Sequence, residues 1–358
     1  MEKPARRLRE EADKALGAGP FRVTDKSILP PSGNPHDYHS RAGYYWPNPD
    51  TKDGLPWVCR DGELNPTSRE SDQGRLLDLS HAVQTLTLAH FFFGGSMEAR
   101  KVVFLLTEFF INPETRMNPH LEYAQSIPGI WDGSGWGIVS SRLLVPIADS
   151  IAMLEATGAI EPTTLELLKG WMATYLLWLL ESENGRAEAD RPNNHATIYD
   201  YQVVALARFT GQHYIAKRVL SEVPARRIDF QLEQTGKQMW EIARRNAFAY
   251  SVANIDHLIE LGLMARHYDI DLLGHASPDG RSIRRSLDFL IPFSIGEEEW
   301  RWERAGHEKA SGENWAPVLL KAAFAFKDPI YREVIPKLTH LDQAEFAFHR
   351  AHLLYPAV

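Results

Sequence analysis

Apolar residues recur at helical spacing along most of the chain from Ser71 onward. Positions three and four residues apart share one face of a helix, whereas few stretches show the strict alternation of a strand. Short turns, such as Thr210–Gly211, separate the apolar runs. The pattern predicts helices at residues 2–16, 76–93, 97–111, 141–157, 162–183, 195–209, 212–222, 246–265, 281–292, 312–327, 329–337 and 343–353.

Many helices of similar length, joined in series, suggest stacked helical hairpins. Such hairpins can close into an α/α toroid around a central cleft, which is one of several arrangements that the pattern allows. The length of 358 residues suits one large domain or two smaller ones, and a hydrophobic content of 44% supplies a sizeable core.

Residues 20–70 break the helical pattern. They are rich in Pro, Gly, Asn and Asp and also contain aromatic residues, as in Pro30–Pro35 and Tyr44–Pro49. Turn formers at this density predict an irregular segment, and the aromatic side chains argue against disorder. We therefore expect an ordered loop that covers another part of the molecule.

Composition narrows the possible functions. A net charge of −8 argues against a general binder of nucleic acid, so an acidic ligand would need a local basic cleft. The single cysteine, Cys59, allows no intrachain disulfide. No apolar run reaches membrane-spanning length, and the N-terminus lacks the apolar core of a signal peptide. The protein is expected either to stay in the cytoplasm or to have lost a leader. Basic residues cluster at Arg226–Arg227, Arg244–Arg245 and Arg281 with Arg284–Arg285, and such clusters are more often solvated helix ends than ligand clamps.

Polar residues gather where the helix predicted near residue 195 begins. Asn193 and Asn194 stand at this point, and an Asn there can cap the helix. His195, Tyr199 and Gln202 are spaced to share one face. This stripe suits the lining of a cleft better than a core, although a lone His in such a position is more often a hydrogen-bonded structural residue.

A second polar group lies near Tyr250, which shares a helix face with Asn254. Arg244 precedes Tyr250 by six residues and would point elsewhere on a continuous helix. If both serve one site, we expect a turn between them. A surface pair of Arg244 and Arg245 beside a core tyrosine fits the pattern equally well.

Other segments leave further chemistry open. Trp131 and Trp136 lie among glycines, which fits either a sugar platform or an ordinary loop. His36 and His39 have no partners at the spacing of metal ligands, so no metal site is expected. The sequence contains no G-x-S-x-G motif, no P-loop, no G-x-G-x-x-G after a strand and no HExxH motif. A two-carboxylate glycoside hydrolase remains possible with the acids Asp132, Glu241 and Glu297–Glu299.

Six segments, taken in order, resemble the alginate lyase superfamily of helical-toroid polysaccharide lyases. No single segment is decisive, but six in the same order are hard to obtain by chance. They extend over roughly residues 5–330 and comprise Ser32–Tyr38, Tyr44–Pro49, Asp61–Pro66, Met117–Gln125, Asn193–His195 and Arg244–Ser251.

The resemblance implies an all-α protein, an incomplete α/α toroid in which residues 1–358 form one domain and residues 20–70 form a lid. It implies that Tyr250 is the catalytic tyrosine and that Asn194, His195 and Arg244 surround the carboxylate of the substrate. It implies no metal and no cofactor. Candidate substrate-binding residues are Tyr44, Tyr45, Gln125, Tyr199, Trp131 and Arg245. The chain departs from the superfamily at Ala196–Ile198 and at Arg245–Asn246, which affects the expected sugar specificity more than the reaction.

These residue types fit β-elimination from a uronate. The C5 proton is acidic only if the neighbouring carboxylate is neutralised, and Arg244, Asn194 and His195 are suitable donors. A tyrosine becomes a base when nearby positive charge lowers its pKa from about 10. In mannuronate and glucuronate one tyrosine can act as base and acid on the same side of the ring. In guluronate, His195 could be the base and Tyr250 the acid.

The sequence therefore predicts a metal-independent lyase for an acidic polysaccharide or oligosaccharide such as alginate or glucuronan, without nucleic-acid or membrane partners. An (α/α)-toroid glycoside hydrolase and a non-catalytic acidic-polysaccharide-binding protein are the alternatives. A polymeric substrate favours a secreted or periplasmic protein, whereas small imported oligomers would allow a cytoplasmic one.

Overall fold

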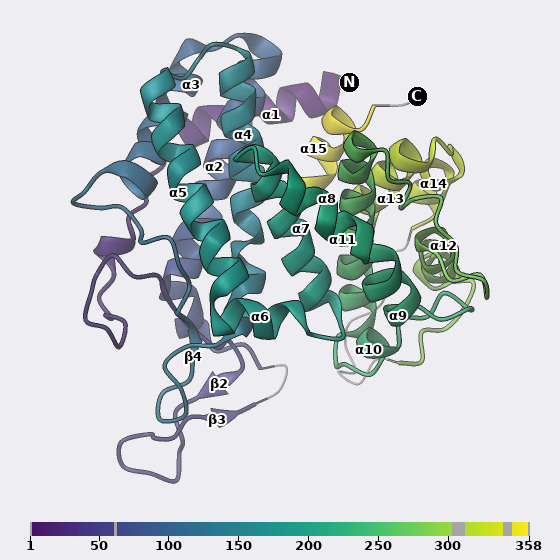
Figure 1. Ribbon diagram of the computed structural model, residues 1–358, viewed down its shortest axis with the longest axis horizontal. Helices are drawn as coiled ribbons and strands as arrows, with labels where there is room; N and C mark the ends of the chain where they lie inside the picture. The colour runs from purple at the N-terminus through teal and green to yellow at the C-terminus, as the bar shows by residue number, and fades with distance from the viewer. Residues whose placement is uncertain (1, 61–62, 303–311, 339–345, 357–358) are drawn as a thin grey trace. The chain divides into compact units, whose positions relative to one another are not determined.

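The computed structural model describes residues 2–60, 63–302, 312–338 and 346–356 and is mostly helical (Figure 1). The chain forms two compact units. The first, here called the C-terminal unit, consists of Met1–Leu8, Arg191–Val204 and His213–Val358. The second, the N-terminal unit, consists of Arg9–Asp190 and Ala205–Gln212.

The N-terminal unit packs long helices against one another. Helix α2 contacts both α3 and α4. The Ser71 hydroxyl caps the start of α2 by accepting from the Gln73 N–H, and Gly94 ends α2 in the left-handed conformation. The helices are α1 (Glu2–Leu16, which also enters the C-terminal unit), α2 (Asp72–Phe93), α3 (Ser96–Leu106), α4 (Leu144–Ala156), α5 (Pro162–Glu181) and α6 (Glu183–Ala189).

The C-terminal unit is arranged around α11, which contacts α10, α12 and α13. Its core includes the fully buried side chains of Trp315 and Tyr331. The helices are α7 (Asn194–Phe209, whose end belongs to the N-terminal unit), α8 (His213–Val223), α9 (Asp229–Gln231), α10 (Met239–Ile242), α11 (Ala247–Ala265), α12 (Ile283–Ser294), α13 (Gly312–Phe326), α14 (Ile330–Val334) and α15 (Phe346–Leu354).

The predicted lid segment is irregular but ordered, as expected from its composition. Strand β1 (His39–Arg41) pairs in parallel with β4 (Tyr123–Ser126), and β2 (Tyr45–Trp46) pairs antiparallel with β3 (Val58–Cys59). The motif residues 61–62 lie outside the described residues. The two small pairings account for the low strand content that the sequence predicted.

Most predicted helices are confirmed, with differences at their ends. The predicted helix 97–111 finishes as a π-helical turn at Thr107–Ile111, and the predicted helix 141–157 is preceded by a 3-10 helix at Gly135–Leu143. The short helices α6, α9 and α10 were not predicted, because fewer than two turns show no clear apolar period. Residues 343–345 of the last predicted helix lie outside the described residues.

One expectation about apolar runs needs correction. The helical stretch Gly135–Ala156 is long and apolar enough to cross a membrane by length and composition alone. The sequence analysis began this helix at residue 141 and so underestimated its length. Because 61% of its most apolar window is buried inside the protein, the stretch has the character of a core helix.

Candidate active site

Four residues that the sequence suggested for a site lie together in the C-terminal unit: three predicted for a lyase, and Glu241, a possible acid of a hydrolase. Asn194 opens α7, Glu241 lies in α10, Arg244 lies in the turn that follows, and Tyr250 lies in the first turns of α11. Arg244 Nη1 donates to Asn194 Oδ1 at 3.0 Å and to Glu241 Oε2 at 3.4 Å. The Arg244 guanidinium carbon lies 3.5 Å from the centre of the Tyr250 ring. These four residues are called the Arg244 cluster below.

The local backbone explains how Arg244 reaches Tyr250. Helix α10 ends at Ile242 and α11 begins at Ala247, so a break separates the two residues. The Arg244 N–H donates to the Glu241 carbonyl, which turns the chain back toward α11. The turn expected between Arg244 and Tyr250 if both serve one site is therefore present, and Arg244 contacts both Asn194 and Tyr250.

The start of α7 is set by the two asparagines in different ways. The Asn193 side chain accepts from the His195 N–H at 3.3 Å and caps the helix, as predicted for one of the pair. Asn194 is 4% exposed, and its N–H donates to Glu241 Oε1 at 2.5 Å. One asparagine therefore serves the helix, while the other contacts Glu241 and Arg244.

Glu241 is the acidic residue of the cluster and is only 1% exposed. Its burial raises the pKa of the carboxyl group, while the Asn194 N–H and the charges of Arg244 and His195 act in the opposite direction. Both carboxylate oxygens accept hydrogen bonds from the cluster. Glu241 is thus tied to the residues that the sequence analysis assigned to the substrate carboxylate.

A network of buried amide side chains is bonded to the start of α7, next to Asn194. Asn254 Nδ2 donates to Gln231 Oε1 at 3.0 Å and to Gln238 Oε1 at 2.9 Å. Gln231 Nε2 in turn donates to the Asn193 carbonyl at 3.2 Å. Asn254 is fully buried and therefore structural, although it shares a face with Tyr250. Gln231 and Gln238 were not predicted from the sequence, because isolated glutamines in short irregular segments carry no periodic signal.

Two other candidates of this unit differ in accessibility. His195 is half-buried at the start of α7, whereas Tyr199 is only 6% exposed. Burial, together with the charge of Asp200, raises the pKa of Tyr199. Arg245 is half-buried and follows Arg244 in the turn. The structure thus leaves less of Tyr199 open to a ligand than the helical stripe of His, Tyr and Gln suggested.

The remaining candidates belong to the N-terminal unit. Tyr45 packs against the buried cluster of Ala42, Trp57 and Ile127, which joins the lid to the segment after β4. Burial raises the pKa of Tyr45, and Cys59 adds to the effect. Tyr44 is half-buried, and its carbonyl accepts from the Arg60 N–H at 2.8 Å.

Gln125 and Trp131 lie in and after β4. Gln125 has a φ angle of 48°, its N–H donates to Ser40 Oγ at 2.9 Å, and its Nε2 donates to the Trp136 carbonyl at 3.3 Å. Trp131 is 39% exposed and meets Trp136 edge to face, with ring centres 5.5 Å apart. An exposed indole is compatible with sugar binding.

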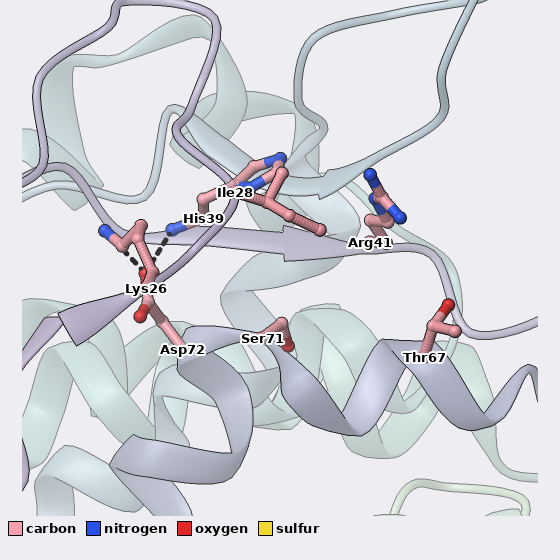
Figure 2. Close-up of a pocket in the computed structure, with 7 residues that line it drawn as sticks. All are labelled: Lys26, Ile28, His39, Arg41, Thr67, Ser71 and Asp72. Carbon is pink, nitrogen blue, oxygen red and sulfur yellow. Dashed lines mark hydrogen bonds and ion pairs between the residues drawn. The ribbon is translucent and has the colours of Figure 1, made fainter.

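A second buried ion pair fixes the lid to α2 (Figure 2). Asp72 Oδ2 accepts from Lys26 Nζ at 2.7 Å and from the His39 N–H at 2.9 Å. Lys26 also donates to the carbonyls of Pro35 and Asp37. These groups border a cavity of about 20 Å³, which is room for about one water molecule. Lys26, His39 and Asp72 are called the Lys26 cluster below.

The two histidines considered as metal ligands have other partners. His36 Nδ1 lies 2.7 Å from the Arg116 carbonyl, and His39 Nε2 lies 2.9 Å from Ser126 Oγ. Within the described ranges, no three His, Cys, Asp or Glu side chains gather in a way that could hold a metal ion.

Comparison with known proteins places this geometry in context. The alginate lyase family model matches residues 22–300. An alginate lyase from Bacteroides ovatus is 33% identical, with a TM-score of 0.91 over 99% of this chain and 94% of that chain. Among the curated proteins, none matches this sequence.

More distant structures share the fold. Alginate lyase A1-III from Sphingomonas species A1 is 12% identical, with a TM-score of 0.57 over 89% of this chain and 87% of that chain. A variant of A1-III complexed with a tetrasaccharide is 10% identical, with a TM-score of 0.51 over 79% and 75% of the two chains. At these identities the likeness concerns the fold alone.

The comparisons confirm the all-α fold class of the (α/α)-toroid type and decide between the alternatives for activity. A hydrolase would need two carboxylates that face the substrate, whereas Glu241 is bound to Asn194 and Arg244. The match to the family model extends over well over half of the chain and includes Asn194, Arg244 and Tyr250. The protein belongs to the alginate lyase family and is a polysaccharide lyase.

Proposed function

We propose that this lyase cleaves a 1,4-linked uronate polysaccharide of the mannuronate or glucuronate type, such as alginate or glucuronan, by β-elimination without a metal ion. The observation that carries the proposal is the position of Arg244, which stacks on the Tyr250 ring and donates to Asn194. One cation is thereby shared between the candidate base and the candidate carboxylate-binding group.

The stacked guanidinium supports Tyr250 as the base. A positive charge at hydrogen-bond range or over the face of a phenol ring stabilises the ionised phenolate relative to the neutral phenol. Arg244 keeps its charge at any pH that the protein meets, because its guanidinium is not deprotonated in proteins. Arg244 therefore favours the phenolate form of Tyr250 that the proposed mechanism needs.

The reaction follows from these roles. The substrate carboxylate is neutralised by Arg244, Asn194 and His195, which stabilises the charge that develops when C5 loses its proton. The Tyr250 phenolate takes that proton, the electron pair of the C5–H bond forms the C4=C5 double bond, and the C4–O4 bond breaks. Tyr250 then returns the proton to the departing O4. The products are a new chain end and an unsaturated uronate.

The stereochemistry sets the substrate preference. In mannuronate and glucuronate the C5 hydrogen and O4 lie on the same side of the ring, so one tyrosine can reach both. In guluronate they lie on opposite sides, and a second group such as His195 would be required. The similar structures described above are alginate lyases, which supports alginate as the first polymer to examine. A polymeric substrate of this kind also favours a secreted or periplasmic protein.

The decisive experiment follows the absorbance of the unsaturated uronate. Purified protein is incubated with polymannuronate, polyguluronate, glucuronan and, as the control, a neutral glucan, with a chelator present and no metal added. We expect absorbance to rise with polymannuronate or glucuronan and to stay flat with the neutral glucan.

Each alternative result has a distinct meaning. Cleavage of polyguluronate alone would contradict the same-side mechanism. Activity that disappears with the chelator and returns with a divalent metal would contradict metal independence. New reducing ends without absorbance would contradict elimination itself.

A further inference from the structure

Glu241 has no role in the elimination as written above, yet it contacts two of the residues that carry it. Its carboxylate is 1% exposed and accepts from the Asn194 backbone and from Arg244. Burying a carboxylate costs free energy unless it is paired and hydrogen-bonded. We therefore ask what a buried glutamate does in the Arg244 cluster.

The bonds of Arg244 indicate what Glu241 does. Its two hydrogen bonds to described residues, to Asn194 Oδ1 and Glu241 Oε2, both leave from Nη1. A guanidinium binds a carboxylate through a pair of parallel N–H groups, and the Nε–Nη2 pair is one such edge. With Nη1 held by two acceptors and the guanidinium stacked on Tyr250, the orientation of that edge is fixed.

We infer that Glu241 is a positioning residue for the reaction, an inference that rests on the proposed elimination. Its Oε1 fixes the backbone of Asn194 and its Oε2 fixes Nη1 of Arg244, so that the Nε–Nη2 edge is presented to the carboxylate of an acidic sugar. Glu241 itself touches neither the sugar nor the transferred proton.

The charge of Glu241 makes this role measurable. Arg244 and His195 face it with positive or potentially positive charge, and the Asn194 N–H donates to it. Burial raises the pKa of Glu241, so it becomes protonated at a higher pH than an exposed glutamate. A protonated Glu241 is a weaker acceptor for Arg244, and activity should therefore fall on the acid side.

The test is Glu241→Gln, which keeps the size of the side chain but removes its charge. We expect kcat to fall on the order of 10- to 100-fold, since small misplacement of catalytic groups has effects of this size. We expect KM not to rise, because removing a negative charge beside Arg244 does not weaken its attraction for an acidic sugar. The acid limb of the kcat profile should change, because the contribution of Glu241 is removed while protonation of the base Tyr250 still lowers kcat at low pH.

A matched control separates positioning from folding. Asp200 is a second buried carboxylate of the same unit, and it accepts from Arg227 Nε at 2.8 Å and from Nη2 at 3.2 Å. Asp200→Asn should lower the melting temperature while kcat per folded molecule and its acid limb stay as in the parent protein. If Glu241→Gln fails to fold, Glu241→Asp keeps the charge and should show intermediate kcat with a displaced acid limb.

The outcomes are distinguishable. A parent protein that forms no unsaturated product contradicts the proposed function and removes the basis of this inference. An active parent together with a folded Glu241→Gln variant of unchanged kcat and unchanged acid limb overturns the positioning role alone. A variant whose kcat falls only in proportion to its folded fraction has the same meaning.

Discussion

The Arg244 cluster and the Lys26 cluster use the same chemistry for different ends. In each, a buried carboxylate accepts from a cation and from the backbone N–H of a residue that begins an element, Asn194 for α7 and His39 for β1. The cations differ. The Lys26 side chain is 4% exposed and donates to three oxygens, whereas the Arg244 side chain is 29% exposed.

The difference teaches how to recognise a functional ion pair. An ammonium group has three donors, and all three of Lys26 are used inside the protein. A guanidinium has five, and the bonds of Arg244 to described residues leave from a single nitrogen. The Lys26 cluster therefore holds the lid segment to α2. The Arg244 cluster keeps N–H groups of Arg244 that could donate to a ligand.

The largest effect expected is that of Tyr250→Phe. Removing the phenol oxygen removes the proposed base and acid, so kcat should fall by roughly 10³- to 10⁴-fold. The binding of an acidic oligosaccharide should persist, because the ring stays under Arg244. Calorimetry measures binding, and absorbance of the unsaturated product measures turnover. Near-normal turnover would show that Tyr250 of the Arg244 cluster is not the base.

Asp72→Ala should have its effect on stability instead. Lys26 would remain buried without its counter-charge, and breaking a buried pair in this way costs about 3–5 kcal/mol of unfolding free energy. Urea denaturation measures the loss. The control is Glu155→Ala, which breaks the exposed pair with Lys169 and should cost less than about 1 kcal/mol. Equal losses of unfolding free energy in the two variants would argue against a stabilising role for the Lys26–Asp72 ion pair.

Arg244→Ala should differ from Asp72→Ala in its effect on turnover. Loss of a preorganised donor at the developing charge lowers kcat by roughly 10²- to 10³-fold. The melting temperature should fall as well, because the variant leaves the carboxylate of Glu241, which is 1% exposed, without its cation, so turnover is measured per folded molecule. A large loss of stability with unchanged kcat per folded molecule would show that Arg244 has a structural role only, like that of Lys26.

The smallest effect should come from pH at the lid. Burial lowers the pKa of His39 from 6.5 to about 4, and the charges of Arg41 and Lys26 add to the effect. As pH falls from 6.5 toward 4, the unfolded chain takes up a proton that the folded chain refuses, so stability falls, by about 1–3 kcal/mol in total. Urea denaturation of the parent protein and of His39→Gln, compared over this range, isolates the contribution. Parallel curves would contradict it.

The sequence predicted local features well and long-range partners poorly. Helical periodicity located most helices. The six-residue spacing of Arg244 and Tyr250 predicted a turn between them if both serve one site, and a turn separates α10 from α11 there. Glu241 was recognised only as a possible hydrolase acid, because its partner Asn194 lies 47 residues away. Lys26 was not singled out for the same reason. A lone polar residue in an irregular segment does not reveal which distant group it will meet.

The backbone strain at Gln125 would affect the outcome of selection for heat resistance. Its backbone lies in the left-handed region, where a side chain other than that of Gly or Asn is strained by about 1 kcal/mol or more. A library screened only for survival at high temperature would therefore be drawn toward Gly at position 125. The selected Gln125→Gly variants would lack the side-chain amide that donates to the Trp136 carbonyl. They would also lose a candidate contact for the sugar.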